Sequence, residues 1–119
     1  MVLILGGVGA GKTAYAHTLG YADDDFTTDA FDEKPVLYDL EALVRRDPDA
    51  SDALLLPLLK KDLVLCAEVG SGVIPFERTD RVWREAVGRL CVRLAQEATA
   101  VVRVVAGIPT VIKGELPCR

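Results

Sequence analysis

Short apolar runs recur along the chain and are bounded by glycine, proline or charged residues. Continuous runs of this kind are typical of strands that are buried in a parallel sheet. We therefore expect five strands, at Val2–Leu5, Pro35–Asp39, Leu63–Cys66, Val101–Ala106 and, as a short last strand, Val111–Ile112.

The stretches between these runs have helical spacing. Apolar residues at positions 83, 87, 90 and 94 recur at steps of three and four, which predicts a long amphipathic helix over Thr79–Ala98. Strands that alternate with helices predict an α/β fold with a mainly parallel sheet. Shorter helices are expected over Lys12–Leu19 up to Gly20, over Leu40–Arg46 up to Pro48, and through Leu59 after a cap at Ser51 or Asp52.

One segment lacks regular spacing. Residues Asp23–Glu33 include six acids. A run of like charges is typical of a solvated, mobile loop, which is the structure we expect here. Metal binding by these acids is the alternative.

The length of 119 residues suits one domain that spans residues 1–119. Half of the residues are hydrophobic, which is enough for a compact core. A domain of this size buries a smaller share of its surface than a larger enzyme does, so we expect a homo-oligomer. The net charge of −4 argues against broad binding to nucleic acid or to an anionic membrane, which needs a positive excess.

Three cysteines, Cys66, Cys91 and Cys118, lie far apart and form neither a CxxC pair nor a metal-ligand spacing. Reduced thiols in a cytoplasmic protein fit this pattern. The apolar run Met1–Leu5 is too short for a signal peptide or a membrane span, and it lacks a basic n-region. We therefore expect a cytoplasmic protein without a membrane span.

The strongest chemical signal is a full match to G-x-x-x-x-G-K-[ST], with a predicted strand before it and a predicted helix after it. Its residues are Gly6, Gly7, Val8, Gly9, Ala10, Gly11, Lys12 and Thr13. The glycines allow consecutive backbone N–H groups to point at phosphate oxygens. Lys12 would place its ammonium near the β- and γ-phosphates, and the Thr13 hydroxyl would bind Mg²⁺. This motif predicts a binding site for a nucleoside triphosphate.

Two acids follow predicted strands. Asp39 ends the second strand, and Glu68 follows the third. Strand carboxyl ends in an open α/β sheet face the ligand crevice, so both acids should converge near the P-loop. Asp39 is the predicted Mg²⁺ ligand beside Thr13, and a cap for the helix that begins at Leu40 is the alternative. Lys12, Asp39 and Glu68 are the candidate catalytic residues.

Three arginines, Arg78, Arg81 and Arg84, lie three residues apart around the start of the long helix. They could neutralise phosphate charge on a substrate or from a neighbouring subunit. The alternative is a solvated helix face that pairs with Glu77 and Glu85.

The only histidine, His17, lies on the same predicted helix as Lys12. The two residues are separated by about 500° of helical rotation, so His17 should point away from the phosphates. A surface or packing role is therefore expected for it.

A second set of residues, more specific than the P-loop, begins at Glu68. It comprises Glu68–Pro75, Arg78, Arg81, Trp83–Glu85 and Gly88–Arg89, with Val36–Leu40, Ala106–Ile108 and Ile112–Lys113 elsewhere in the chain. Together with the double glycine that opens the P-loop, these residues resemble the bifunctional adenosylcobinamide kinase and adenosylcobinamide-phosphate guanylyltransferase family of cobalamin biosynthesis. The similarity covers both ends of the chain and most of what lies between.

The resemblance implies a RecA-like P-loop fold, a homotrimer and two reactions. One reaction phosphorylates the aminopropanol hydroxyl of adenosylcobinamide with ATP or GTP, and the other transfers GMP from GTP through a guanylylated histidine. In the family that histidine lies in a longer segment between the P-loop helix and the acid-ending strand. Here the segment shrinks to Tyr21–Lys34 and contains no histidine, and Cys91 stands where the family usually has asparagine. The resemblance therefore carries the kinase reaction to this chain without the nucleophile of the second reaction.

The first hypothesis is thus an enzyme that phosphorylates adenosylcobinamide, a corrinoid, with ATP or GTP and Mg²⁺. A nucleotide-binding regulatory or assembly module without catalysis is a second, because the shortened middle segment removes substrate-covering elements. A small P-loop kinase with another acceptor is a third.

Overall fold

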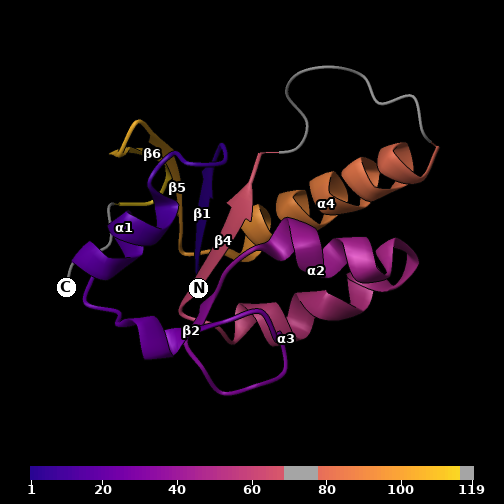
Figure 1. The fold of residues 1–119 in the computed structure, drawn as a ribbon, viewed down its shortest axis with the longest axis horizontal. Helices are drawn as coiled ribbons and strands as arrows, with labels where there is room; N and C mark the ends of the chain where they lie inside the picture. The colour runs from indigo at the N-terminus through magenta and orange to yellow at the C-terminus, as the bar shows by residue number, and fades with distance from the viewer. Residues whose placement is uncertain (69–77, 116–119) are drawn as a thin grey trace.

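The computed structural model describes residues 1–68 and 78–115, and in these ranges six strands form one sheet (Figure 1). The strand order is β2-β3-β4-β1-β5-β6. All neighbours pair in parallel except β6, which runs antiparallel to β5. The strands are β1 (Val2–Gly6), β2 (Phe26–Thr27), β3 (Val36–Leu37), β4 (Leu63–Ala67), β5 (Ala100–Val105) and β6 (Ile108–Lys113). The predicted α/β fold with a mainly parallel sheet is confirmed.

Helices cover both faces of this sheet. Figure 1 shows α1 on one side and α2, α3 and α4 on the other. The α-helices are α1 (Lys12–Thr18), α2 (Leu40–Arg46), α3 (Leu55–Leu59) and α4 (Arg78–Glu97), and two 3₁₀ segments are η1 (Asp23–Asp25) and η2 (Pro48–Leu54). In the part of the chain that the structure describes, no helix combines the length and apolar character needed to cross a membrane.

The alternation of side chains along each strand divides the core in two. Leu3 of β1 packs with Leu90 and Leu94 of α4 in one cluster. Its neighbour Ile4 points the other way and packs with Ala16 of α1. Because the central strands are buried on both faces, they read as continuous apolar runs, which is why the sequence pattern located them.

Three predicted elements differ clearly from the observed ones. β3 covers only Val36–Leu37 of the predicted strand Pro35–Asp39, so Asp39 lies beyond the end of the strand. The last strand is longer than Val111–Ile112, because β6 is an exposed edge strand whose length is set by pairing with β5. The predicted cap of the helix through Leu59 is wrong: η2 runs directly into α3, and no side chain caps α3. Ser51, one of the two predicted caps, is instead buried within η2.

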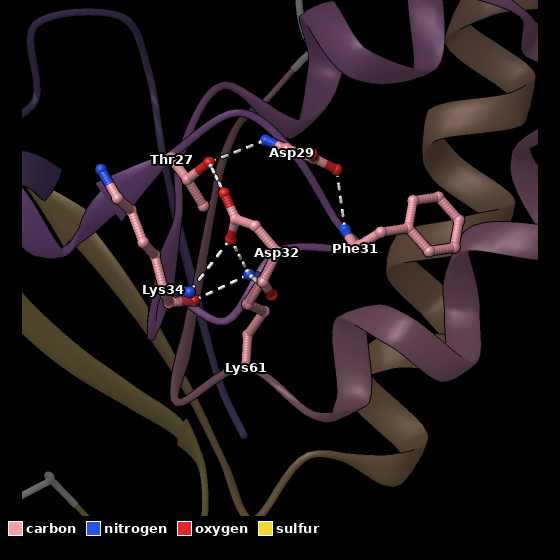
Figure 2. Close-up of polar contacts among 6 residues, drawn as sticks. All are labelled: Thr27, Asp29, Phe31, Asp32, Lys34 and Lys61. Carbon is pink, nitrogen blue, oxygen red and sulfur yellow. Dashed lines mark hydrogen bonds and ion pairs between the residues drawn. The ribbon is translucent and has the colours of Figure 1, made fainter.

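The prediction of an irregular loop over Asp23–Glu33 is also wrong in part. This segment contains η1 and the strand β2, which pairs in parallel with β3. Its side chains are tied to one another as well: Thr27 donates to Asp32, and the N–H groups of Asp29 and Phe31 donate to Thr27 and Asp29 (Figure 2). The acids thus cap turns locally instead of leaving the segment free.

A buried lysine anchors this segment to the start of β4. Lys61 is only 4% exposed, and its ammonium donates to the Asp32 carboxylate at 2.7 Å and to the carbonyls of Asp32 and Lys34 at 2.8 and 2.7 Å (Figure 2). An ammonium has three N–H donors, so its donors are matched by these acceptors. The hydrogen bonds from Lys61 and Thr27 lower the pKa of Asp32 to about 2.

We expect Lys61→Met to lower the melting temperature by about 5 °C or more, because the substitution leaves three acceptors without their donor. Thermal unfolding of the variant and of the wild type measures this difference.

Asp32→Asn should also destabilise the fold, in a pH-dependent way. The folded pKa of Asp32 is depressed, so its contribution is complete above about pH 4 and is lost as the pH falls toward 2. Urea unfolding of the wild type and of Asp32→Asn from pH 2 to pH 7 checks this prediction. It is contradicted if the wild type still has the larger free energy of unfolding, by the same difference, at pH 2.

Candidate functional site

The P-loop leaves β1 at the carboxyl edge of the sheet and enters α1. Gly11 stands immediately before the helix with φ 99°, a left-handed conformation that glycine adopts without a Cβ penalty. It also supplies no side chain to cap the helix. The backbone N–H groups of the first helical turn therefore remain for a ligand, as the motif predicts.

Close backbone packing requires glycine at two P-loop positions. A Cβ on Gly6 would lie 2.7 Å from the carbonyl oxygen of Val104, and one on Gly11 would lie 3.1 Å from the Cα of Gly107. The N–H of Gly107 donates to the carbonyl of Ala10 at 2.8 Å. The loop is thus pressed against the turn between β5 and β6, which supports its shape from behind.

Lys12 bends back over the loop that precedes it. Its ammonium donates to the carbonyls of Gly6 and Gly7 at 3.0 and 2.8 Å. These bonds use two of the three N–H donors of an ammonium, so one remains for an incoming phosphate oxygen. Lys12 therefore shapes the loop and supplies positive charge to it.

A hollow of about 340 Å³ opens over the loop. P-loop residues from Val8 to Thr13 line one side, and side chains from β3–α2 and β4 line the other. The residues that line it are Val8, Gly9, Ala10, Gly11, Lys12, Thr13, Ala14, Asp39, Glu41 and Ala67. The structure thus brings Asp39 to the P-loop, although β4 separates β3 from β1 in the sheet.

Asp39 lies at the junction of β3 and α2. It has φ 53° and ψ 45°, a left-handed conformation that is uncommon for a residue with a side chain. It occupies the N-cap position of α2, yet its side chain makes no cap hydrogen bond. Backbone strain of this kind is concentrated at functional sites. The exposed carboxylate therefore faces the hollow without the capping role that was its alternative.

A further acid, Glu41, lines the same hollow, although the sequence pattern did not predict it as a site residue. Its Oε1 accepts a hydrogen bond from the N–H of Ala67 at 3.0 Å, which fixes the carboxylate between α2 and the end of β4. The sequence cue for Glu41 is its place in the first turn of a helix that follows a strand and an acid. Acids are common in the first turn of any helix, so this cue alone does not indicate a site residue. Only the tertiary fold brings β4 beside Glu41.

The donor set in this hollow suits a hard cation. Thr13 offers a hydroxyl, and Asp39 and Glu41 offer carboxylates. Mg²⁺ in nucleotide sites is typically bound through one or two carboxylates, with waters and substrate phosphates completing its shell. Among the described residues, no group of three or more acids, histidines or cysteines could hold a metal ion alone. The arrangement therefore fits a Mg²⁺ that arrives with a nucleotide.

Glu68 follows β4 and is engaged in an ion pair. Its two carboxylate oxygens accept hydrogen bonds from the guanidinium of Arg103 on β5, at 2.6 and 3.0 Å. These bonds, and further the charge of Lys12, lower the pKa of Glu68. Its backbone N–H also donates to the carbonyl of Gly6 at 3.1 Å. Glu68 thus lies next to the start of the P-loop. Its ion pair with Arg103 spans β1, which lies between β4 and β5 in the sheet.

The structure does not bring the three arginines to the P-loop of the same chain. Arg78 lines a different hollow, with Arg45 and Trp83, and none of Arg78, Arg81 and Arg84 lines the P-loop hollow. Figure 1 shows that the first turns of α4 lie far from β1 and α1. Their action on a substrate or on a neighbouring subunit stays a prediction. Glu77, a predicted partner, and residues 69–75 of the family-like stretch lie outside the described residues.

His17 lies outside the P-loop hollow, on the exposed side of α1. Its Nε2 pairs with Asp23 at 2.9 Å, and its ring meets Phe26 edge to face at 5.2 Å. A second hollow of about 260 Å³, lined by Thr13, Asp23, Phe26 and Tyr38, adjoins this cluster. The histidine is therefore used to join η1 and β2 to α1.

The mainly parallel sheet with helices on both faces, together with the P-loop between β1 and α1, defines a RecA-like P-loop NTPase domain. Residues 39–112, more than half of the chain, match the family described as cobinamide kinase / cobinamide phosphate guanyltransferase. The chain therefore belongs to this family. As a member, it is a nucleotide-dependent transferase of cobalamin biosynthesis. The P-loop precedes the matched stretch, so motif and family match are separate observations. A search of curated proteins returned no match.

Gly6→Ala should destabilise the fold by about 1–3 kcal/mol, because its Cβ would meet a backbone oxygen that cannot move aside. Gly7→Ala is the matched control, since a Cβ at Gly7 meets nothing within 4 Å. Urea unfolding midpoints of the two variants test this difference. Equal midpoints would show that the close approach at Gly6 is not a constraint.

Proposed function

We propose that this protein transfers a phosphoryl group from ATP or GTP to the hydroxyl of a cobinamide-type corrinoid. The observation that carries the proposal is the hollow in which the P-loop, Lys12 and two carboxylates face one another. The family membership supports the corrinoid as acceptor, because a cobinamide kinase reaction is part of the family description.

The P-loop would bind and orient the triphosphate. Backbone N–H groups at the start of α1 and the remaining donor of Lys12 would contact the β- and γ-phosphate oxygens. Charge on a transferring phosphoryl group spreads over its outer oxygens, so fixed donors at these positions lower the barrier to transfer. The contacts of Lys12 with the carbonyls of Gly6 and Gly7 hold the ammonium ready for this task.

Mg²⁺ would be held by the Thr13 hydroxyl and the Asp39 carboxylate, with Glu41 as a further oxygen donor directly or through water. When bound, the ion supplies charge neutralisation at the phosphates. The free side chain of Asp39 supports this role over that of a helix cap. Glu41 is suited to it because the Ala67 N–H fixes one of its oxygens and leaves the other for a ligand.

Glu68 would orient the acceptor hydroxyl more than deprotonate it. A carboxylate with a lowered pKa is a weak base, and the two hydrogen bonds from Arg103 lower the pKa of Glu68. A loose phosphoryl transfer needs little base catalysis, so positioning is the greater contribution.

We further propose that guanylyl transfer through a histidine is not an activity of this chain. The single histidine, His17, pairs with Asp23 and meets Phe26 edge to face outside the P-loop hollow. The kinase reaction needs no such nucleophile, so it stands without that residue.

The activity test uses [γ-³²P]GTP or [γ-³²P]ATP with adenosylcobinamide and Mg²⁺. We expect label in a phosphorylated corrinoid and, by intact-mass measurement after incubation with GTP, no GMP bound to the protein. Absence of labelled corrinoid at every Mg²⁺ concentration would refute the kinase proposal. Tight nucleotide binding without turnover would favour a regulatory module, and label in an unrelated alcohol would favour a kinase with another acceptor. A GMP adduct on the protein would refute the proposal that guanylyl transfer is not an activity of this chain.

The binding test separates the phosphate cradle from the metal ligands. Lys12→Ala should weaken ATP and GTP binding by about 10- to 100-fold, because it removes a charged hydrogen bond to phosphate. Asp39→Asn and Glu41→Gln should instead reduce the gain in affinity that Mg²⁺ gives. Calorimetric titration with and without Mg²⁺ measures both effects.

Glu33→Gln is the matched control for the two acidic variants in this titration. Glu33 lies before β3, at the opposite edge of the sheet, so this substitution removes the same negative charge as Asp39→Asn or Glu41→Gln but far from the hollow. If Lys12→Ala bound nucleotide as tightly as the wild-type protein does, the P-loop would not be the nucleotide site.

A further inference from the structure

Two cysteines far apart in the sequence meet beneath the candidate site. The Sγ atoms of Cys66 on β4 and Cys91 on α4 lie 3.7 Å apart. Both are free thiols in this structure. Cys66 is fully buried, whereas Cys91 is half-buried. Cys91 is therefore the thiol that a small reagent can reach.

The thiol pair is connected to the P-loop hollow on both of its sides. On the β4 side, Ala67 follows Cys66 and donates its N–H to the carboxylate of Glu41. On the α4 side, the indole N–H of Trp83, two turns before Cys91, donates to the backbone carbonyl of Glu41 at 2.7 Å. Glu41 and Ala67 both line the hollow. A change in the spacing of β4 and α4 therefore reaches Glu41 from both directions.

We propose that Cys66 and Cys91 are a redox modification site, at which a low-molecular-weight disulfide forms a reversible intrachain disulfide that alters nucleotide affinity. Formation of the bond depends only on the thiol geometry. The affinity change rests on the proposed nucleotide site.

The chemistry proceeds by two thiol–disulfide exchanges. The thiolate of Cys91 attacks one sulfur of the oxidant RSSR, which forms a mixed disulfide and releases RS⁻. Cys66 then loses its proton and attacks the Cys91 sulfur, which forms the protein disulfide and releases a second RS⁻. Two thiols are oxidised by two electrons, and the oxidant is reduced to two RSH.

The environment of the pair favours this order. The hydrogen bond between the two thiols lowers the pKa of Cys91, although burial and the charge of Glu41 oppose it. The same hydrogen bond and the burial of the strand raise the pKa of Cys66. Cys91 is therefore both the more accessible thiol and the one that forms a thiolate more readily.

Bond formation requires movement. A disulfide has a sulfur–sulfur distance of about 2.05 Å, so the atoms must approach by roughly 1.7 Å. β4 is paired on both sides, with β1 and β3, and cannot shift without breaking these ladders. Rotation of the two cysteine side chains supplies part of this approach, and any backbone displacement that accompanies it falls on α4, which carries Trp83 and is linked through it to Glu41.

The experiment uses the full chain, first reduced and then incubated with hydroxyethyl disulfide. Remaining thiols are blocked with N-ethylmaleimide in denaturant, and the intact mass is measured. The chain has three cysteines, so the reduced protein should take three labels. The oxidised protein should lose the labels of Cys66 and Cys91, with the 66–91 link found in a peptide map, while Cys118 either takes a label or carries one RS group from the oxidant. Dithiothreitol should restore three labels. Nucleotide affinity of the oxidised protein should change by about fivefold or more, with a shift in the fluorescence of Trp83.

Cys91→Ser and Cys118→Ser are the matched controls. Cys91→Ser should form no link and keep its affinity after oxidation, whereas Cys118→Ser should behave like wild type. Failure of wild type to form the 66–91 link, while Cys118 reacts with the oxidant, would overturn the modification site. A link without a change in affinity would overturn its coupling to the hollow. If the reduced protein bound no nucleotide, the proposed function would fail while the mass readout of the link still stood.

Discussion

The site depends on the parallel pairing of β1 with β4 on one side and with β5 on the other. This pairing ends all three strands at one edge, so whatever follows each strand meets the P-loop. From β4 come Ala67 and Glu68; from β5 come Arg103 and the turn that contains Gly107. A shift of one residue in either register would turn these side chains to the opposite face.

The charged side chains around the loop are each held by a separate partner, with one exception. Lys12 is held by loop carbonyls, Glu68 is held by Arg103, and Glu41 is held by a backbone N–H of β4. Asp39 alone among the acids of the hollow keeps a side chain without a hydrogen bond in the described structure, on a strained backbone. Groups that are fixed before a ligand binds need little reorganisation, which suits a site for a highly charged phosphate.

The opposite edge of the sheet is stabilised by different means. There Lys61 and Asp32 tie the short segment between α1 and β3 to the start of β4. The ammonium group and a few turns close the connection, so that β3 lies beside β4 and presents Asp39. The segment thus helps to position Asp39 at the P-loop hollow.

The sequence alone determined the P-loop, the buried strands and the long helix, because each depends on local signals: a fixed glycine spacing, continuous apolar runs and a helical period. It also identified Asp39 and Glu68 as strand-end acids. What each acid contacts, and that the two thiols meet, depends on the tertiary structure. The Arg103 pair, the Ala67 N–H on Glu41 and the contact of Cys66 with Cys91 join residues that are 25 or more positions apart. Such contacts depend on strand order and helix packing, and these have no local pattern in the sequence.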